Sequence, residues 1–359
     1  MNGRRLVAPF LALAVGASLA LGGPVDRVTA ATPTLAQLIG QKLVVAMSGT
    51  TPSADLLGRI RRGEVGGVIL FGSNVTTKTA LVSLTKQLHA AAAAGGQPRF
   101  LVAVDQEGGS IKRIPWAPPT LSPPQMGALG STTTARSQGQ LTGAALKALG
   151  IDVDLAPVAD VPASTSSFLY QQGRTWSFSA TRTASLSDAF STGLELGGEI
   201  PSMKHFPGLG YATLNTDTHM VSIRVSRTAL APGLLPYRTA IPHGMPLIML
   251  SNATYSAYDP YAAAGWSPAI NTTLLRGTLG FRGVTITDSL DGTAASRGYT
   301  TAHIAYRAAK AGTDMLLITG SEATSRGVFS SLLSEAQSGA IPLSLLQASY
   351  ARILALKNR

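Results

Sequence analysis

Cysteine is absent from this chain of 359 residues. The absence excludes disulfide bonds, and it also excludes the acylated N-terminal cysteine of a lipoprotein. Stability must therefore come from a hydrophobic core. Hydrophobic residues make up 45% of the chain, which is enough for one large barrel or for two ordinary domains, and composition alone does not choose between them.

Acidic residues are scarce too, since 18 Asp and Glu stand against 29 Lys and Arg. Residues 1–30, for which a signal peptide is predicted below, contain Arg4, Arg5, Arg27 and Asp26. The rest of the chain has 26 basic and 17 acidic residues, which gives a net charge of +9. This excess either serves the solubility of a secreted protein or attracts the protein to an anionic cell envelope. The basic residues are scattered and form no stripe interleaved with aromatics, which argues against nucleic-acid binding.

The N-terminus predicts a secretory signal peptide. Arg4 and Arg5 precede an uncharged, apolar run over residues 6–23, and the small residues Val28-Thr29-Ala30 predict cleavage before Ala31. An uncleaved membrane anchor is the alternative. We therefore expect a signal peptide at residues 1–30, a mature domain at 31–359, and a protein that is secreted or associated with the cell envelope.

Short, apolar, β-branched runs alternate with segments of helical composition along the whole chain. The runs are residues 42–47, 67–71, 100–104, 151–156, 200–203, 246–250, 283–287 and 314–318. The clearest helical segments are residues 78–94, 133–149, 185–199, 301–311 and 342–356. No Gly-rich or Pro-rich linker divides the chain, so the pattern predicts an α/β protein with a single-domain (β/α)₈ (TIM) barrel.

Polar residues follow three of the predicted strands. Asp105 follows the third strand, Lys204 and His205 follow the fifth, and Asp288 follows the seventh. Because the carboxyl ends of barrel strands meet at one mouth, we expect an active site there. One such carboxylate could simply cap the next helix, but several polar strand ends are harder to explain as caps. Glycosidic cleavage requires such a set of titratable groups.

A metal site is the competing explanation for these polar residues. His205 and His219 are separated by a loop, and the sequence has no His-x-x-x-His or His-x-His spacing. This spacing argues against a metal centre.

The motifs that surround these residues resemble glycoside hydrolase family 3. They include Lys204-His205-Phe206-Pro207-Gly208, Asp217-Thr218-His219, Asp105-Gln106-Glu107-Gly108-Gly109 and Thr287-Asp288. The resemblance extends from about Leu38 to Leu356. Within the family, the chain is most similar to the single-domain bacterial β-N-acetylglucosaminidases that act on cell-wall fragments.

The resemblance implies a role for each matching residue. Asp288 would be the nucleophile that forms a covalent glycosyl-enzyme intermediate, with retention of configuration. His219 would be the general acid/base, oriented and charge-supported by Asp217 on the same loop. The implied sugar-binding residues, which would contact hydroxyl and acetamido groups, are Asp105, Arg113, Arg174, Lys204 and His205. No metal and no cofactor are implied.

The chain departs from the family pattern near the expected site. Leu209 stands where a second histidine is usual, and the loop from Lys204 to Asp217 is two residues longer than is common. Asp291 and Gly292 follow the expected nucleophile where a small residue and a methionine are typical, and Asp291 would add negative charge there. These departures affect the geometry of the acid/base loop and the substrate range, rather than the reaction class.

Four other residues near these motifs have expected roles of their own. Asp160 and Asp314 are expected to be structural, as capping or bracing residues. Trp116 and Trp176 either stack on a sugar ring or fill the layer of loops around the barrel mouth.

The leading hypothesis is therefore an exported, exo-acting β-N-acetylglucosaminidase that releases terminal GlcNAc from peptidoglycan fragments or related glycosides. A related β-glucosidase-like hydrolase, or a phosphorylase that uses phosphate in place of water, is a second enzyme hypothesis. A catalytically silent, envelope-binding barrel is the third, although the presence of Asp288, Asp217 and His219 argues against it. The sequence predicts no oligomeric state.

Overall fold

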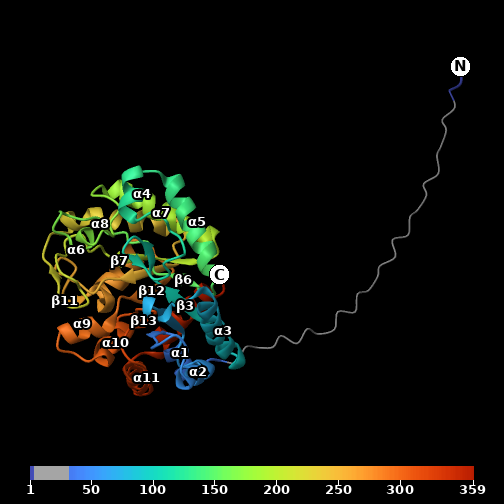
Figure 1. Ribbon diagram of the computed structural model, residues 1–359, viewed down its shortest axis with the longest axis vertical. Helices are drawn as coiled ribbons and strands as arrows, with labels where there is room; N and C mark the ends of the chain where they lie inside the picture. Colours follow the sequence, from blue (N-terminus) through green and yellow to red (C-terminus); the bar gives the residue numbers. More distant parts are fainter. Residues whose placement is uncertain (4–31) are drawn as a thin grey trace. The chain divides into compact units, whose positions relative to one another are not determined.

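Eight parallel strands form a barrel at the centre of the protein (Figure 1). The computed structural model describes residues 1–3 and 32–359, so all but three residues of the expected signal peptide lie outside the described residues. The barrel strands are β1 (Leu43–Ala46), β2 (Gly67–Leu70), β3 (Leu101–Val104), β6 (Val153–Asp154), β7 (Ile200–Phe206), β9 (Leu247–Leu250), β12 (Val284–Thr287) and β13 (Leu316–Ile318). All eight overlap the predicted runs, although β7 extends three residues beyond its run, and the predicted (β/α)₈ barrel is confirmed.

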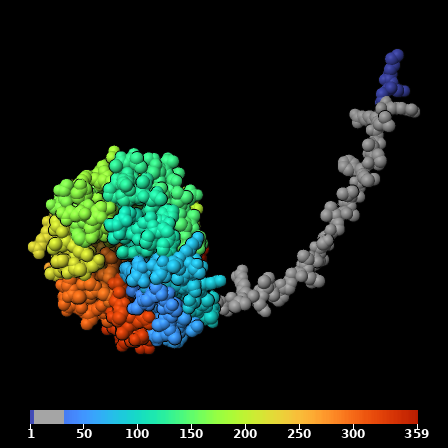
Figure 2. Space-filling model, viewed as in Figure 1, coloured from blue at the N-terminus to red at the C-terminus, as the bar shows by residue number. Residues whose placement is uncertain are grey.

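The strands follow one another around the barrel in chain order, from β1 to β13. The first and last strands pair through Leu43–Leu316, Val44–Leu317 and Val45–Ile318. Accordingly, the blue and red ends of the domain lie side by side in Figure 2. Between β12 and β13 the backbone pairing is reduced to one isolated bridge, Ile286–Met315, which nearly closes the ring.

Helices surround the barrel (Figure 1). They are α1 (Leu35–Gly40), α2 (Ala54–Arg61), α3 (Lys78–Ala94), α4 (Pro123–Leu129), α5 (Thr132–Lys147), α6 (Phe168–Gln171), α7 (Ala180–Leu196), α8 (Arg227–Ala240), α9 (Leu290–Ser296), α10 (Thr301–Lys310), α11 (Glu322–Gln337) and α12 (Leu343–Lys357). Helix α3 has the predicted bounds because Thr77 caps its first turn and Gly95 follows its last. Among the described residues, no helix is long and apolar enough to cross a membrane.

Shorter strands lie outside the barrel. Two of them, β4 (Gln106–Gly108) and β5 (Ile111–Lys112), form a hairpin directly after β3. A second small sheet joins β8 (Ser222–Ile223), β10 (Thr254–Tyr255) and β11 (Asp259–Ala263). Both small sheets belong to segments that follow barrel strands.

The core follows from the two-residue period of the strands. In β1, Val44 and Ala46 belong to the apolar cluster inside the barrel, whereas Leu43 and Val45 pack against the surrounding helices. Every residue of this strand is therefore buried, as expected of a parallel strand covered on both faces.

Asp314 joins β12, β13 and the last helix at the end of the barrel where strand β13 begins. It is fully buried, and its carboxylate accepts hydrogen bonds from Arg276, Arg352, Ser349 and the backbone N–H of Thr285. The expected structural role of Asp314 is therefore confirmed.

Candidate active site

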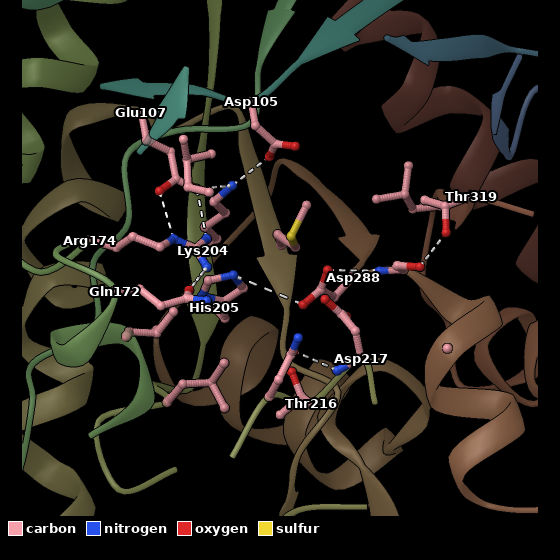
Figure 3. Close-up of a pocket in the computed structure, with 18 of the residues that line it drawn as sticks. Asp105, Glu107, Gln172, Arg174, Lys204, His205, Thr216, Asp217, Asp288 and Thr319 are labelled. Carbon is pink, nitrogen blue, oxygen red and sulfur yellow. Dashed lines mark hydrogen bonds and ion pairs between the residues drawn. The ribbon is translucent and has the colours of Figure 1, made fainter. Parts of the chain in front are cut away.

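A cavity of about 470 Å³ opens at the carboxyl ends of the barrel strands (Figure 3). Its floor is apolar, since Ile69, Met249 and Leu317 from the barrel interior line it. Its walls carry most of the polar residues predicted from the sequence: Asp105, Arg113, Arg174, Lys204, His205, Asp217 and Asp288. His219 is the one predicted site residue whose side chain does not line this cavity.

Buried charges form one wall of the cavity. Lys204, near the end of β7, places its Nζ atom 2.7 Å from Asp105 Oδ1 and 2.7 Å from Glu107 Oε1. Arg174 donates two hydrogen bonds to the Glu107 carboxylate, of 2.8 and 2.7 Å. Each buried charge thus faces a partner of opposite sign, which makes burial tolerable.

Glu107 was not among the predicted site residues, although it lies in the motif that pointed to Asp105. Its side chain is 1% exposed. Burial alone would raise the pKa of Glu107, but Arg174 and Lys204 outweigh burial and lower it to about 2. The carboxylate therefore stays charged and fixes both cations at the cavity wall.

Arg113 and Asp105 lie on either side of the β4–β5 hairpin. The Arg113 guanidinium is 3.5 Å from Asp105 Oδ2 and lies 5.5 Å from the centroid of the Phe71 ring. Gly108 and Gly109 adopt φ values of 93° and 61°, which permit the tight turn that brings the hairpin back to the cavity. Asp105 consequently keeps oxygen atoms near the cavity for hydrogen bonding to a ligand.

His205 is oriented by Asp160, the second residue expected to be structural. Asp160 Oδ2 lies 2.7 Å from His205 Nδ1, and Asp160 also accepts the backbone N–H groups of His205 and Leu209. The other ring nitrogen, Nε2, then lies 4.0 Å from Asp288 Oδ2. Leu209 contributes its backbone N–H to this arrangement, so that bond does not depend on which side chain stands at position 209.

Asp288 follows β12 directly and points into the cavity, with its side chain 16% exposed. The backbone N–H of Ser289 donates to its Oδ1 atom at 2.8 Å. This hydrogen bond holds the carboxyl group of Asp288 in position at the cavity. An accessible carboxyl group in a fixed position at a barrel mouth has the geometry that a nucleophile needs.

Asp291 does not line the cavity. One of its oxygens accepts the Thr319 backbone N–H at 2.6 Å, and the other accepts the Thr301 hydroxyl at 3.1 Å. Asp291 therefore braces the segment that follows β13, and its carboxylate is engaged away from the nucleophile.

Asp217 enters the cavity from the loop formed by residues 207–223, and Figure 3 shows its side chain beside Asp288. Its Oδ1 atom is buried and has no hydrogen-bond partner among the described residues. Burial and the negative charge of Asp288 raise the pKa of Asp217 to about 7, although the positive charges of His205 and Arg174 oppose the rise. A carboxyl group with this pKa exchanges protons near neutral pH.

His219 lies on the same loop but is exposed. Its Nδ1 atom is 2.8 Å from the Thr218 hydroxyl, and no ion pair or hydrogen bond joins its ring to Asp217 in the described part of the chain. The expected pairing of Asp217 with His219 is thus not formed in this structure.

The two tryptophans have different environments. Trp176 is buried, donates its Nε1–H to the carbonyl of Val158 at 2.7 Å and packs against Phe190. It fills the layer of loops rather than the cavity. Trp116 is 47% exposed and does not line the cavity.

Within residues 32–359, no group of three or more His, Asp or Glu side chains is arranged to hold a metal ion.

A barrel mouth that brings carboxylates and fixed charges into one cavity is typical of enzymes that cleave glycosidic bonds. Residues 34–356 match the model of the glycosyl hydrolase family 3 N terminal domain, so the chain belongs to this family and is a glycoside hydrolase.

Proteins of the same family resemble the chain over most of its length. It is 33% identical to an uncharacterized secreted glycosyl hydrolase of Arthroderma benhamiae, covering 90% of this chain and 94% of that protein. It is 34% identical to a beta-hexosaminidase of Nitrosomonas eutropha, covering 77% of this chain and 80% of that enzyme.

Solved structures agree with this assignment. A beta-N-acetylhexosaminidase from Beutenbergia cavernae superposes with a TM-score of 0.85 at 32% identity, covering 92% of this chain and all of that one. A family 3 beta-N-acetylglucosaminidase from a Paenibacillus strain superposes with a TM-score of 0.87 at 28% identity. The match covers 91% of this chain and 62% of the Paenibacillus chain, which is therefore considerably longer.

Proposed function

We propose that the protein is a retaining, exo-acting β-N-acetylglucosaminidase that removes terminal β-linked GlcNAc from peptidoglycan fragments or related glycosides. The observation that carries this proposal is the pair Asp217 and Asp288, which brings two carboxyl groups with different environments into one sugar-binding cavity. The names of the hexosaminidase relatives support the amino-sugar substrate.

The reaction would proceed in two steps. Asp288 attacks the anomeric carbon, the glycosidic bond breaks, and the loop at residues 207–223 supplies a proton to the leaving oxygen. Water then releases the sugar from Asp288 and returns the proton to that loop. In the assignment expected from the family resemblance, His219 transfers the proton and Asp217 supports its charge, which requires the loop to turn His219 toward the cavity.

The remaining charged residues would hold the terminal sugar. Asp105, Arg113, Lys204, Arg174 and His205 supply donors and acceptors in fixed positions around the cavity. Fixed charges lose little entropy on binding, and hydroxyl and acetamido groups are recognised by convergent hydrogen bonds. The closed, apolar floor leaves no exit for a continuing chain, which supports release of single sugars from chain ends.

The proposed site of action is outside the cytoplasm. The signal-peptide pattern at residues 1–30 supports export, and one relative is itself named as a secreted hydrolase. The net positive charge supports an electrostatic attraction to anionic wall polymers.

The direct test compares turnover of 4-nitrophenyl β-N-acetylglucosaminide and 4-nitrophenyl β-glucoside, each with and without phosphate. We expect hydrolysis of the amino sugar, little turnover of the glucoside and no acceleration by phosphate. A sugar 1-phosphate as product would instead establish a phosphorylase. Failure on both glycosides and on a small muropeptide would refute the catalytic role.

A further inference from the structure

A second hollow opens beside the active-site cavity, among helices α4, α6 and α7 (Figure 1). Its volume is about 310 Å³. Phe168 and Leu169 of α6 line the active-site cavity, whereas Tyr170 of the same helix lines this second hollow. Arg174 likewise faces the cavity, and residues 175–178 line the second hollow. One segment of the chain therefore contributes to both.

Two exposed aromatic rings form part of the wall of the second hollow. Tyr170 is 40% exposed and Phe178 is 48% exposed, and the centroids of the two rings are 4.8 Å apart. Exposed apolar side chains that gather in one place mark binding surfaces more often than single ones do. We call the hollow around Tyr170, Phe178 and Arg182 the aromatic groove.

The aromatic surface continues past Phe178. This ring also lines a smaller groove of about 230 Å³, together with Tyr211, which is 40% exposed. Glycine and proline residues form much of the rest of the smaller groove: Pro162, Gly208, Gly210, Pro232 and Gly233. The three rings thus belong to one continuous surface, which suits a chain-like ligand better than a compact one.

The aromatic groove is already formed in the structure. Its lining includes Trp176, whose buried ring is fixed by the hydrogen bond to the carbonyl of Val158. Helix α4 packs tightly on the same residue, since a Cβ atom at Gly127 would lie 1.7 Å from the Trp176 carbonyl oxygen. A ligand therefore meets a rigid surface, and little free energy is lost in ordering it.

Arg182 brings a positive charge to the aromatic groove. Its backbone N–H is bound by Ser179 and its carbonyl by Ser185, but its guanidinium has no acidic partner in the described part of the chain. Arg182 lies in the first turn of α7, where the helix dipole is also positive. The groove therefore attracts a ligand that carries a negative charge.

We propose that the aromatic groove is a second, non-catalytic carbohydrate-binding site, which holds a glycan strand that bears carboxylate groups. Exposed aromatic rings offer apolar faces that match the C–H faces of pyranose rings. The Arg182 guanidinium binds a carboxylate of the strand through charge-assisted hydrogen bonds. Because the groove lies beside the active-site cavity, a strand bound there stays close to the active site after each terminal sugar is released.

The identity of the strand rests on the proposed function, whereas the binding itself does not depend on turnover. In a peptidoglycan strand, muramic acid alternates with GlcNAc and carries a carboxyl group on its lactyl side chain. This carboxyl group is free once the peptides are removed. Such a strand supplies both features that the groove requires, pyranose rings and negative charge.

The test measures binding by isothermal titration calorimetry in the Asp288→Ala variant, so that the glycan stays intact. One probe is a glycan strand of peptidoglycan whose peptides have been removed by an amidase, and the other is an uncharged chito-oligosaccharide of similar length. Excess GlcNAc occupies the active-site cavity in every titration. We expect the acidic strand to bind more tightly than the uncharged one, and its binding to weaken as NaCl is added.

Substitutions in the groove separate stacking from charge. Tyr170→Ala and Phe178→Ala should each lower the affinity for both probes about fivefold, whereas Tyr170→Phe should keep it. Arg182→Gln should lower the affinity for the acidic strand alone, by about threefold. Tyr261→Ala is the matched control, because Tyr261 is 88% exposed on β11 and lines neither groove, and it should change nothing.

Turnover distinguishes this site from the active site. With Asp288 intact, Phe178→Ala should leave kcat/KM for 4-nitrophenyl β-N-acetylglucosaminide unchanged, because Phe178 does not line the active-site cavity. On the long acidic strand, the same substitution should raise KM and leave kcat unchanged.

Three outcomes would overturn the proposal. If Phe178→Ala bound both probes as tightly as Tyr261→Ala does, the groove would hold no glycan. Equal affinity for the two probes, insensitive to Arg182→Gln, would exclude recognition of a carboxylate. A dimer in sedimentation velocity that Phe178→Ala dissociates would assign the groove to a second copy of the chain. Failure of the unaltered protein to turn over any glycoside, with the binding differences preserved, would refute the proposed function and support the groove as a binding site.

Discussion

Replacing Asp217 by Asn should stabilise the protein, and more so as the pH rises. In the folded protein, burial and the charge of Asp288 raise the pKa of Asp217 from 3.8 to about 7, which corresponds to about 4 kcal/mol against the ionised form. The folded state therefore binds this proton more tightly than the unfolded state does, and the associated stability is lost as the pH rises toward 7. Asparagine has a similar shape but never ionises.

The size of the effect follows from the same pKa values. Between pH 5 and pH 8, ionisation of Asp217 should cost the wild-type protein about 2–3 kcal/mol relative to the unfolded chain. In a domain of this size, the Tm advantage of Asp217→Asn should therefore be about 2–4 °C larger at pH 8 than at pH 5.

Thermal unfolding followed by circular dichroism at both pH values measures this difference. Asp55→Asn is a suitable control, because Asp55 is an exposed helix residue that pairs with Arg326 at the surface. Its variant should show the same Tm shift at both pH values. If the advantage of Asp217→Asn were likewise independent of pH, Asp217 would not be held beside Asp288, and the reasoning about the site would be wrong.

Three further substitutions test other parts of the site. Asp288→Ala should lower kcat about 10³-fold or more on every glycoside while substrate binding persists, as measured by initial rates and by calorimetry. Glu107→Gln should destabilise the protein by about 3 kcal/mol in urea unfolding at pH 7 and raise KM, because two buried cations lose their shared carboxylate; the difference from wild type should shrink as the pH falls from 4.5 toward 2. Asp160→Asn should lower kcat at least about tenfold, with a smaller change in KM, because the ring of His205 loses its orientation.

Much of the fold could be predicted from the sequence because the barrel strands are local, apolar and separated by capped helices. Helix α3 has the predicted bounds, and Asp105 and Asp288 follow the strands that were expected to present them. The strand that carries Lys204 is longer than predicted, since β7 continues to Phe206. The prediction ended this strand at Met203 because the polar residues Lys204 and His205 interrupt the apolar run. An apolar pattern gives no information on whether the backbone goes on pairing through polar residues.

The position of the acid/base loop could not be predicted in the same way. It depends on a contact between Asp217 and Gly292, which are far apart in the sequence, and on a turn at Asn215 that sends His219 outward. In the sequence, the longer loop before Asp217 and the glycine at position 292 are two separate departures from the family pattern. In the structure they are in contact, because the backbone of Asp217 occupies the space that a side chain at position 292 would need.

The site also depends on the seam between β12 and β13. Strand β12, which ends at the expected nucleophile, has four paired residues with β9 on one side but only a single backbone bridge with the chain near Met315 on the other. Asp314 compensates at the opposite end of the barrel by binding the Thr285 N–H together with two arginines. The alignment of the nucleophile is thereby coupled to an ion cluster outside the cavity, so substitutions in that cluster should alter catalysis without changing any residue that lines the cavity.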